Sequence, residues 1–327
     1  MAVPSEWRFD ALTGRKVLIA PARADRPIRP RNKCPFCEGF ECETPAEVLA
    51  VRAPGTSQDG PGWQIRVVPN RYAAVRMPNI GTNLPPVLPA LTRCLEGREP
   101  GVGVAEVIVE CPHHEANFAK LAPQLVRAAV HAWRERLRHW RDDGRLAFAQ
   151  VFKNEGPSAG ASIDHCHSQL IGVPAVPPGV TRELDAFRKA AALAGRCPTC
   201  EVVDAGRRSE RFVAESAEFI AACPFAPRFA GETWIIPKRC APALEAVGDD
   251  EAAAFADILL DVLARIGRVF KGPDYNVVIK GPPFRHVGPY HWRAEVLPRT
   301  SPSAGWEWGT GALINTLLPE RAAELLR

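Results

Sequence analysis

The sequence predicts an α+β fold made of two tandem halves, each an antiparallel sheet flanked by helices. Short strand-like runs alternate with longer segments of helical periodicity. A Cys-x-x-Cys pair opens each half, at Cys34/Cys37 and at Cys197/Cys200, and strands, a long helix and a two-stranded hairpin then follow in both. At 327 residues the chain has room for one large or two medium domains, and we expect them at 1–175 and 176–327.

The first half is expected to contain short strands and one long helix. Apolar residues recur at every fourth position from Leu121 through Leu125, Ala129 and Trp133 to Leu137. Such a stripe is typical of a helix that packs on a sheet, here over 121–141. The strands are expected at 16–20, 63–68, 104–110, 145–152 and 165–173.

The second half is expected to contain two helices and a hairpin. Thr181, followed by Glu183 and Asp185, indicates the start of a helix over 181–194, because threonine caps a first turn and carboxylates favour it. The remaining elements are a helix over 249–270 that opens with acidic residues, hairpin strands at 275–280 and 291–296, and a Pro-rich linker between the halves at 172–179.

The most informative stretch is His165-Cys166-His167-Ser168-Gln169-Leu170. Alternate residues of a strand point the same way, so His165, His167 and Gln169 share one face. A neutral imidazole can attack phosphorus directly, and a neighbouring amide can hold the non-bridging oxygens as charge shifts in the transition state. This pattern predicts a catalytic strand rather than a strand with two core histidines.

The segment just before this strand is suited to an anion. Residues 152–162 include two glycines and several small residues, which expose backbone N–H groups. Asn154 and Ser162 add side-chain donors. The loop and the strand together predict a phosphate-handling site.

Composition excludes several other classes of protein. The hydrophobic content of 46%, the charged content of 24% and the net charge of +4 are ordinary, and no Lys/Arg run indicates a nucleic-acid partner. No stretch approaches eighteen consecutive apolar residues, and the first thirty residues lack the apolar core of a signal peptide. Four of the ten cysteines lie in Cys-x-x-Cys pairs, which favours metal ligation over disulfides. We therefore expect a cytoplasmic protein without a membrane partner.

Several further motifs follow one another in a specific order. They are Arg8-Phe9-Asp10, Thr13-Gly14-Arg15, residues 19–27, Cys34-Pro35-Phe36-Cys37, Val68-Pro69-Asn70-Arg71-Tyr72, Glu110-Cys111-Pro112-His113-His114 and residues 305–311. In this order the chain resembles the galactose-1-phosphate uridylyltransferase family of the histidine-triad superfamily, which includes an ADP-glucose phosphorylase branch. The resemblance covers essentially the whole chain, and residues 305–311 are similar to the phosphorylase branch. It implies two tandem histidine-triad-like domains and a homodimer.

The resemblance also implies a reaction. A nucleoside monophosphate moves between a nucleotide sugar and a hexose 1-phosphate, as in the UDP-glucose-dependent uridylyltransferases of galactose metabolism. The transfer is ping-pong, with His167 as nucleophile and Gln169 holding the phosphoryl oxygens. The remaining roles fall on Arg23 and Arg26 near the phosphates, Asn70 at the nucleoside, Glu307 at the sugar hydroxyls and Trp306 as a wall of the sugar pocket.

Two zinc sites are expected, one in each half. Cys34 and Cys37 have the spacing of a zinc knuckle, and His114 and His165 can complete a tetrahedral site. The resemblance selects His114 over His113. The second site would use Cys197, Cys200, His291 and Cys240, the last at a position where the family has a histidine.

The second half is expected to lack a nucleophile. When the two hairpins are aligned, Arg293 replaces His167 and Glu295 replaces Gln169. Because arginine stays protonated, it cannot attack phosphorus. One active site per chain is therefore expected, in the first half.

The donor and two other classes of function remain open. Leu313 stands where uridylyltransferases carry a glutamine, which leaves ADP-glucose phosphorylase, with inorganic phosphate as acceptor, as an alternative. A diadenosine polyphosphate phosphorylase would use the same His-x-His-x-Gln motif but need not carry paired Cys-x-x-Cys sites. A zinc-ribbon nucleic-acid-binding protein would explain the cysteines and leave His167 and Gln169 without a role.

Overall fold

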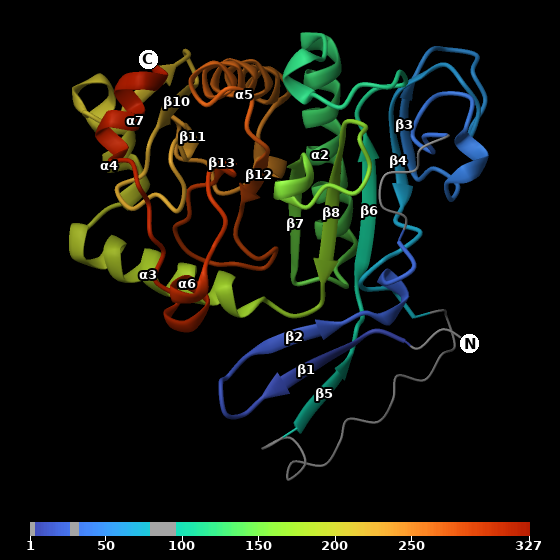
Figure 1. Cartoon of the computed structure of the whole chain (residues 1–327), viewed down its shortest axis with the longest axis horizontal. Coiled ribbons are helices and arrows are strands. Elements are labelled where there is room, and N and C mark those ends of the chain that lie inside the picture. Colours follow the sequence, from blue (N-terminus) through green and yellow to red (C-terminus); the bar gives the residue numbers. More distant parts are fainter. Residues whose placement is uncertain (1–3, 27–32, 79–95) are drawn as a thin grey trace.

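A computed structural model describes residues 4–26, 33–78 and 96–327, which form one large and one small antiparallel sheet (Figure 1). The large sheet has ten strands in the order β3 (Leu49–Arg52), β4 (Trp63–Pro69), β6 (Val104–Val109), β8 (His167–Val173), β7 (Phe148–Glu155), β12 (Tyr275–Lys280), β13 (Arg293–Pro298), β11 (Thr233–Pro237), β10 (Phe219–Ala222) and β9 (Phe212–Glu215). The small sheet has the order β2 (Lys16–Ile19), β1 (Glu6–Asp10) and β5 (Glu96–Pro100).

The large sheet repeats one arrangement of strands. From one edge inward the order is β3-β4-β6-β8-β7, and from the other edge it is β9-β10-β11-β13-β12. Each strand of the first half thus has a counterpart at the same place in the second half, and antiparallel pairing of β7 with β12 joins the two series. The predicted α+β fold with two tandem antiparallel halves is confirmed. The sequence did not show that the halves share one continuous sheet.

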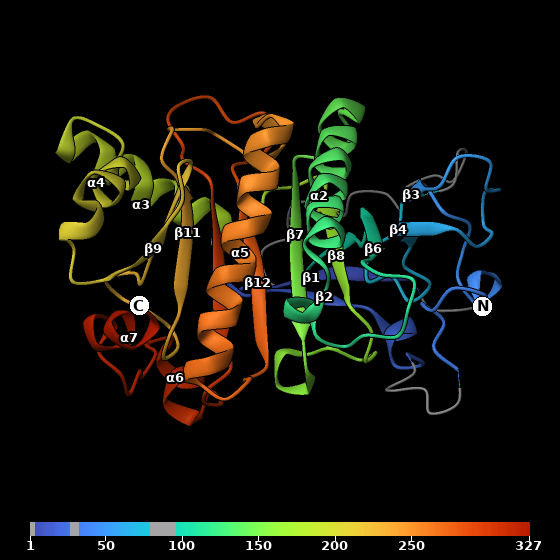
Figure 2. The ribbon, with the colours of Figure 1, turned by 90° about the horizontal axis from the view of Figure 1, so that it is seen from above.

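Two long helices cover one face of this sheet (Figure 2). They are α2 (Pro123–Asp143) and α5 (Asp249–Val269), one from each half. Ala129, Trp133 and Leu137 of the predicted apolar stripe are buried in the core between α2 and the strands. The other helices are α3 (Pro178–Ala194), α4 (Pro198–Ala205), α6 (Gly305–Thr310) and α7 (Pro319–Leu326). None of the helices in the described ranges is long and apolar enough to cross a membrane.

Several predicted element starts are wrong: β7 begins at 148 rather than 145, β13 at 293 rather than 291 and α2 at 123 rather than 121. Two others bear on the site. α3 begins at Pro178 rather than Thr181, because proline suits the first position of a helix, where its missing N–H is not needed. β8 begins at His167 rather than His165, because the N–H of Cys166 donates to the carbonyl of Glu115 instead of joining the strand ladder. His165 therefore lies just ahead of β8.

Candidate active site and metal centres

Strand β8 presents different side chains to the two faces of the sheet. Ser168 points toward α2, where the indole N–H of Trp133 donates to its hydroxyl at 2.6 Å. His167 and Gln169 therefore lie on the opposite face, because neighbouring residues of a strand alternate. On that face they line a cavity of about 350 Å³ together with Arg26, Asn70 and Ser162. Five of the residues predicted for catalysis or substrate binding thus meet in one cavity.

The imidazole of His167 is held in its neutral form. Its Nδ1 lies 2.7 Å from the carbonyl oxygen of His165, so Nδ1–H donates there and Nε2 keeps its lone pair. Burial lowers the pKa of His167 to about 3, and the positive charges of Lys153 and Arg26 act in the same direction, against the hydrogen bond to His165. The ring of Phe36 packs against the imidazole, with the centroids 5.2 Å apart. A neutral, desolvated imidazole of this kind can attack phosphorus.

Two hydrogen-bonding groups beside His167 have no partner in the described part of the chain. The hydroxyl of Ser162 is buried and unpartnered, and the amide of Gln169 makes no hydrogen bond there. Buried polar groups in folded proteins are nearly always paired, so unpaired ones at a cavity indicate a place for a polar ligand. Both groups can donate to phosphoryl oxygens.

The loop between β7 and β8 that contains Gly156 and Gly160, called the Gly-rich loop below, is shaped by its contact with the second half. Gly156 has φ of 80°, and a Cβ there would lie 1.9 Å from a carboxylate oxygen of Asp274. The same carboxylate accepts a hydrogen bond from the N–H of Ser158 at 2.6 Å. Only glycine fits this position, since any side chain would collide with Asp274 in a backbone conformation that favours glycine.

Asn154 supports this loop and does not line the cavity. Its Oδ1 accepts a hydrogen bond from the Asn276 amide at 2.9 Å, and the same amide donates to the carbonyl of Ala159. The interaction crosses from β7 to β12 and so ties the loop to the second half.

Cationic side chains surround the cavity. Arg26, Lys33 and Arg71 line it, against the single carboxylate of Glu43 among the described lining residues. This balance suits a phosphorylated ligand. Arg23 does not line the cavity, because its guanidinium donates to the carbonyl of Tyr72 at 3.1 Å.

Trp306 and Glu307 do not reach the cavity within one chain. Both lie on α6, where Trp306 is 59% exposed. The carboxylate of Glu307 accepts a hydrogen bond from the N–H of Ala304 at 2.9 Å and so caps its own helix. Within one chain these two residues therefore cannot make the contact with a sugar in the cavity that the sequence had predicted.

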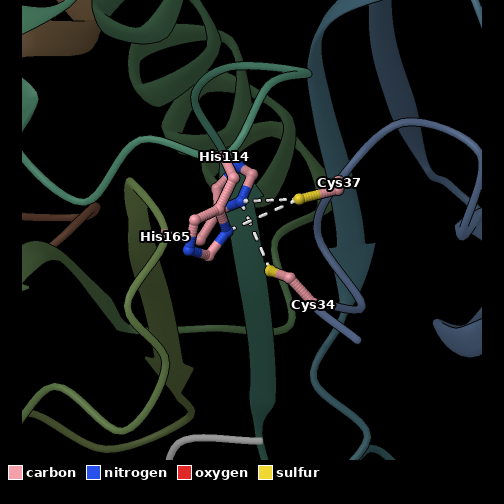
Figure 3. Close-up of side chains that lie close together, drawn as sticks. All are labelled: Cys34, Cys37, His114 and His165. Carbon is pink, nitrogen blue, oxygen red and sulfur yellow. Dashed lines mark hydrogen bonds between the residues drawn. The ribbon is translucent and has the colours of Figure 1, made fainter. Parts of the chain in front are cut away.

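The four side chains predicted for the first metal site lie together (Figure 3). One ligand atom from each of Cys34, Cys37, His114 and His165 lies within 4.8 Å of all the others. The Sγ–Nδ1 distances are 3.4 Å for Cys34 to His165, 3.6 Å for Cys37 to His165 and 3.5 Å for Cys37 to His114. Tetrahedral zinc with Zn–S of about 2.3 Å and Zn–N of about 2.0 Å requires about 3.5 Å between S and N. The residues therefore fit zinc.

The tautomer of His165 also suits a metal. Its Nε2 lies 2.9 Å from the carbonyl oxygen of Cys111, so Nε2–H donates there and the lone pair of Nδ1 faces the two thiols. His113 is not part of the cluster.

The second predicted metal site has the same arrangement. Cys197, Cys200, Cys240 and His291 lie together, with ligand atoms within 4.8 Å of one another. Nδ1 of His291 is 3.8 Å from the sulfur of Cys197 and 3.6 Å from that of Cys200, and its Nε2 is 2.8 Å from the carbonyl oxygen of Pro237. Cys240 is the exposed member of the set.

In the second half, ion pairs fill the place that corresponds to the active site. Arg293, at the position of His167, pairs with Glu295 at 2.6 Å and with Glu183 of α3 at 2.8 Å. Lys280 also pairs with Glu183, and Arg228 pairs with Glu295. Arg228 also pairs with Glu232 at 2.6 Å, so the three cations of this cluster face three carboxylates, and none of these groups is an imidazole.

Sequence reasoning missed Glu183 as a partner of Arg293 and missed a buried pair beneath β8. That pair consists of Lys153 and Glu110, with Nζ 2.6 Å from Oε2. A lysine beside the Gly-rich loop, at an inward position of its strand, was the available signal.

Comparison with known proteins identifies relatives along the whole chain. Residues 2–177 match the family described as galactose-1-phosphate uridyl transferase, N-terminal domain, and residues 124–326 match a domain of unknown function, DUF4921. ADP-glucose phosphorylase of Arabidopsis thaliana is 32% identical, covering 98% of this chain and 92% of the relative. Galactose-1-phosphate uridylyltransferase of Thermotoga maritima is 28% identical, covering 98% of both chains.

Solved structures show the same similarity. ADP-glucose phosphorylase from Arabidopsis thaliana with bound ADP-glucose has a TM-score of 0.78 at 32% identity, over 99% of this chain and 98% of that chain. A uridylyltransferase structure has a TM-score of 0.80 at 28% identity, over 98% of this chain and 97% of the other.

Proposed function

Since the chain belongs to the galactose-1-phosphate uridylyltransferase family of nucleotidyltransferases, we propose that His167 carries a nucleoside monophosphate between a nucleotide sugar and a phosphate-bearing acceptor. The family and its tandem histidine-triad-like fold are as the motifs predicted. The hydrogen bond from Nδ1–H of His167 to the carbonyl of His165 carries the proposal, because it leaves Nε2 free in a cavity of nucleotide size.

The first step forms a bond from Nε2 of His167 to the α-phosphorus of the donor. The bond from that phosphorus to the hexose 1-phosphate oxygen breaks, and hexose 1-phosphate leaves as an anion that needs no acid. In the second step a phosphate oxygen of the acceptor attacks the same phosphorus, and the His167 nitrogen leaves with its electron pair. Gln169 and Ser162 donate to the non-bridging oxygens in both steps, where charge develops. Arg26, which lines the cavity, is proposed to face the phosphates, whereas Arg23 does not line the cavity and its guanidinium donates to the carbonyl of Tyr72.

The donor and acceptor that we propose first are UDP-glucose and a hexose 1-phosphate. ADP-glucose with inorganic phosphate is the second candidate pair. It is favoured by Leu313, which stands in place of the uridylyltransferase glutamine, and by the 32% identity to an ADP-glucose phosphorylase. The nucleoside would lie against Asn70 in either case.

The two halves are proposed to have different roles, one catalytic and one structural. Residues 1–175 carry the reacting groups, and residues 176–327 form a degenerate copy whose Arg293 replaces the nucleophile. Zinc, when bound, supplies structural cross-links rather than chemistry, through the cluster containing His165 in the first half and the cluster containing His291 in the second. Reduced cysteines of this kind suit the cytoplasm, the compartment that we propose.

We also propose that two chains form a homodimer. α6 and the segment after it expose large apolar side chains, namely Trp306, Trp308, Leu313 and Ile314. A second chain packed on this surface would bury them and would bring Glu307 near a sugar bound to the partner.

The experiment that tests the proposal is incubation with UDP- and ADP-sugars that carry the label on the α-phosphate. We expect stable label on the protein, mapped to the peptide that contains His167, and no label on His167→Ala. Steady-state plots at several acceptor concentrations should be parallel, because the first product leaves before the acceptor binds. A covalent adduct on another residue would refute the mechanism, and so would intersecting plots without exchange of hexose 1-phosphate into the donor.

A further inference from the structure

The strand ladder beside the nucleophile is incomplete. β7 pairs with β8 only as far as Lys153 opposite Ser168. Beyond that point Asn154 and Glu155 pair with β12 instead, so the strands separate to admit the Gly-rich loop. His167 is the next residue of β8 and has a strand partner only on its other side, where Val109 of β6 lies. The residue that must hold a reacting atom in place thus lacks half of its backbone support.

A buried ammonium occupies this gap. The side chain of Lys153 is 1% exposed, and its Nζ lies 3.2 Å from the main-chain carbonyl oxygen of His167 and 2.6 Å from Oε2 of Glu110. The ring of Phe118 closes the space, with Nζ 4.4 Å from its centroid. Burial would lower the pKa of Lys153, but the charges of Glu110 and Glu155 more than offset this and raise it, so the donor stays protonated.

The second half offers an internal comparison. There β12 and β13 remain paired through Lys280 opposite Arg293, the counterpart of the nucleophile. The position that corresponds to Lys153 is Ile279, which pairs with Ala294, the residue after Arg293. Where the nucleophile is absent, the ladder is complete and the buried lysine is absent too. The buried lysine is therefore found only in the half that has the gap beside the histidine, and the shared fold of the two halves does not require it.

We propose that Lys153 is a positioning residue, whose ammonium, balanced by Glu110, holds the main-chain carbonyl of His167 in place of the missing strand partner. This role rests on the proposed function of His167 as nucleophile. Holding the carbonyl fixes the backbone from which the imidazole projects, and so the direction in which Nε2 approaches phosphorus. A misplacement of about 1 Å at a reacting centre can lower a rate by about 10²-fold.

The test removes Lys153 together with its nearest counter-charge, Glu110. Glu155, whose carboxylate lies 3.8 Å from Nζ, keeps the hydrogen bond from the N–H of Phe118. Lys153→Met alone would leave the Glu110 carboxylate buried without a counter-charge, so two double variants are used, Lys153→Met with Glu110→Leu and Lys153→Met with Glu110→Gln. The matched control is Arg136→Met with Glu106→Gln. That buried pair, at 2.6 Å, joins α2 to β6 of the same sheet and makes no hydrogen bond or ion pair with His167.

The readouts are the single-turnover rate of label transfer to the protein, the Kd of the donor, zinc content and Tm. For the Lys153 double variants we expect transfer to slow by about 10- to 100-fold. The donor Kd should change by less than about threefold, because the nucleotide-binding side chains are untouched. In the control the transfer rate should stay within about threefold of wild type.

Two results would overturn the proposal. One is a folded Lys153 double variant with full zinc content that is labelled as fast as wild type. The other is an equal loss of rate in the Arg136 control, which would indicate general loosening of the sheet. If wild type itself carries no label on His167, the proposed function fails. If wild type is labelled and the variants match it, only the role of Lys153 fails.

Discussion

Replacing Gln169 by alanine should slow nucleotidyl transfer and leave the fold intact. The side chain lies on the same face of β8 as His167 and lines the cavity. It makes no hydrogen bond in the described part of the chain, so its removal leaves no internal donor or acceptor unpaired. The loss is therefore confined to the complex with substrate, where the amide would donate to the phosphoryl oxygens.

The expected size of the effect follows from this geometry. One preorganised donor to a developing negative charge contributes about 10²–10³-fold to a rate, or about 2.7–4 kcal/mol. Gln169→Glu should lose at least as much, because it places a carboxylate beside the phosphates. In the second half Glu295 occupies the position of Gln169, where it pairs with Arg228 and Arg293. The first half has His167 at the position of Arg293, so a glutamate at 169 would lack that partner.

The assay is a rapid-quench measurement of label transfer at saturating donor, with Tm measured alongside. We expect both Gln169 variants to form the labelled protein slowly, and Gln169→Ala to keep its Tm within about 2 °C of wild type. A transfer rate for Gln169→Ala within about fivefold of wild type would refute the reasoning, because it would mean that the amide does not bind the transition state. A large fall in Tm would show instead that Gln169 supports the fold.

Three further predictions concern metal and charge. Cys34→Ser should lose one zinc and most activity, since His165 lies two residues before His167, whereas Cys197→Ser should lose one zinc and mainly lower Tm. Cys240→Ala should lower metal content from about two towards one per chain by elemental analysis, and two zinc ions bound as tightly as before would exclude it as a ligand. Burial raises the pKa of Glu183, but Arg293 and Lys280 more than offset this and hold the pKa below its ordinary value. Glu183→Gln should therefore lower Tm at pH 7. The difference from wild type should shrink as pH falls below the ordinary pKa of glutamate, about 4.3, and vanish only below the lowered pKa of the folded protein; a difference independent of pH would contradict this.

The sequence by itself determined the features that depend on local geometry. The two-residue period of a strand put His167 and Gln169 on one face, and the four-residue stripe identified the buried side of α2. The spacing of two Cys-x-x-Cys pairs, with the family resemblance, selected the eight side chains that the structure brings into two clusters. Such inferences succeed because the backbone period and the ligand spacing act over a few residues.

The tertiary structure decided what depends on distant segments. Lys153 meets Glu110 across 43 residues and Arg293 meets Glu183 across 110, and neither pair shows a local signal. Trp306 and Glu307, expected at the sugar, lie on α6 outside the cavity of their own chain. The gap in the ladder beside His167 arises because Asn154 and Glu155 of β7 pair with β12 and have no partner on β8. Which charges become buried and which strands pair depend on which segments pack together. The free energy of that packing is distributed over the whole core, so no single motif predicts it.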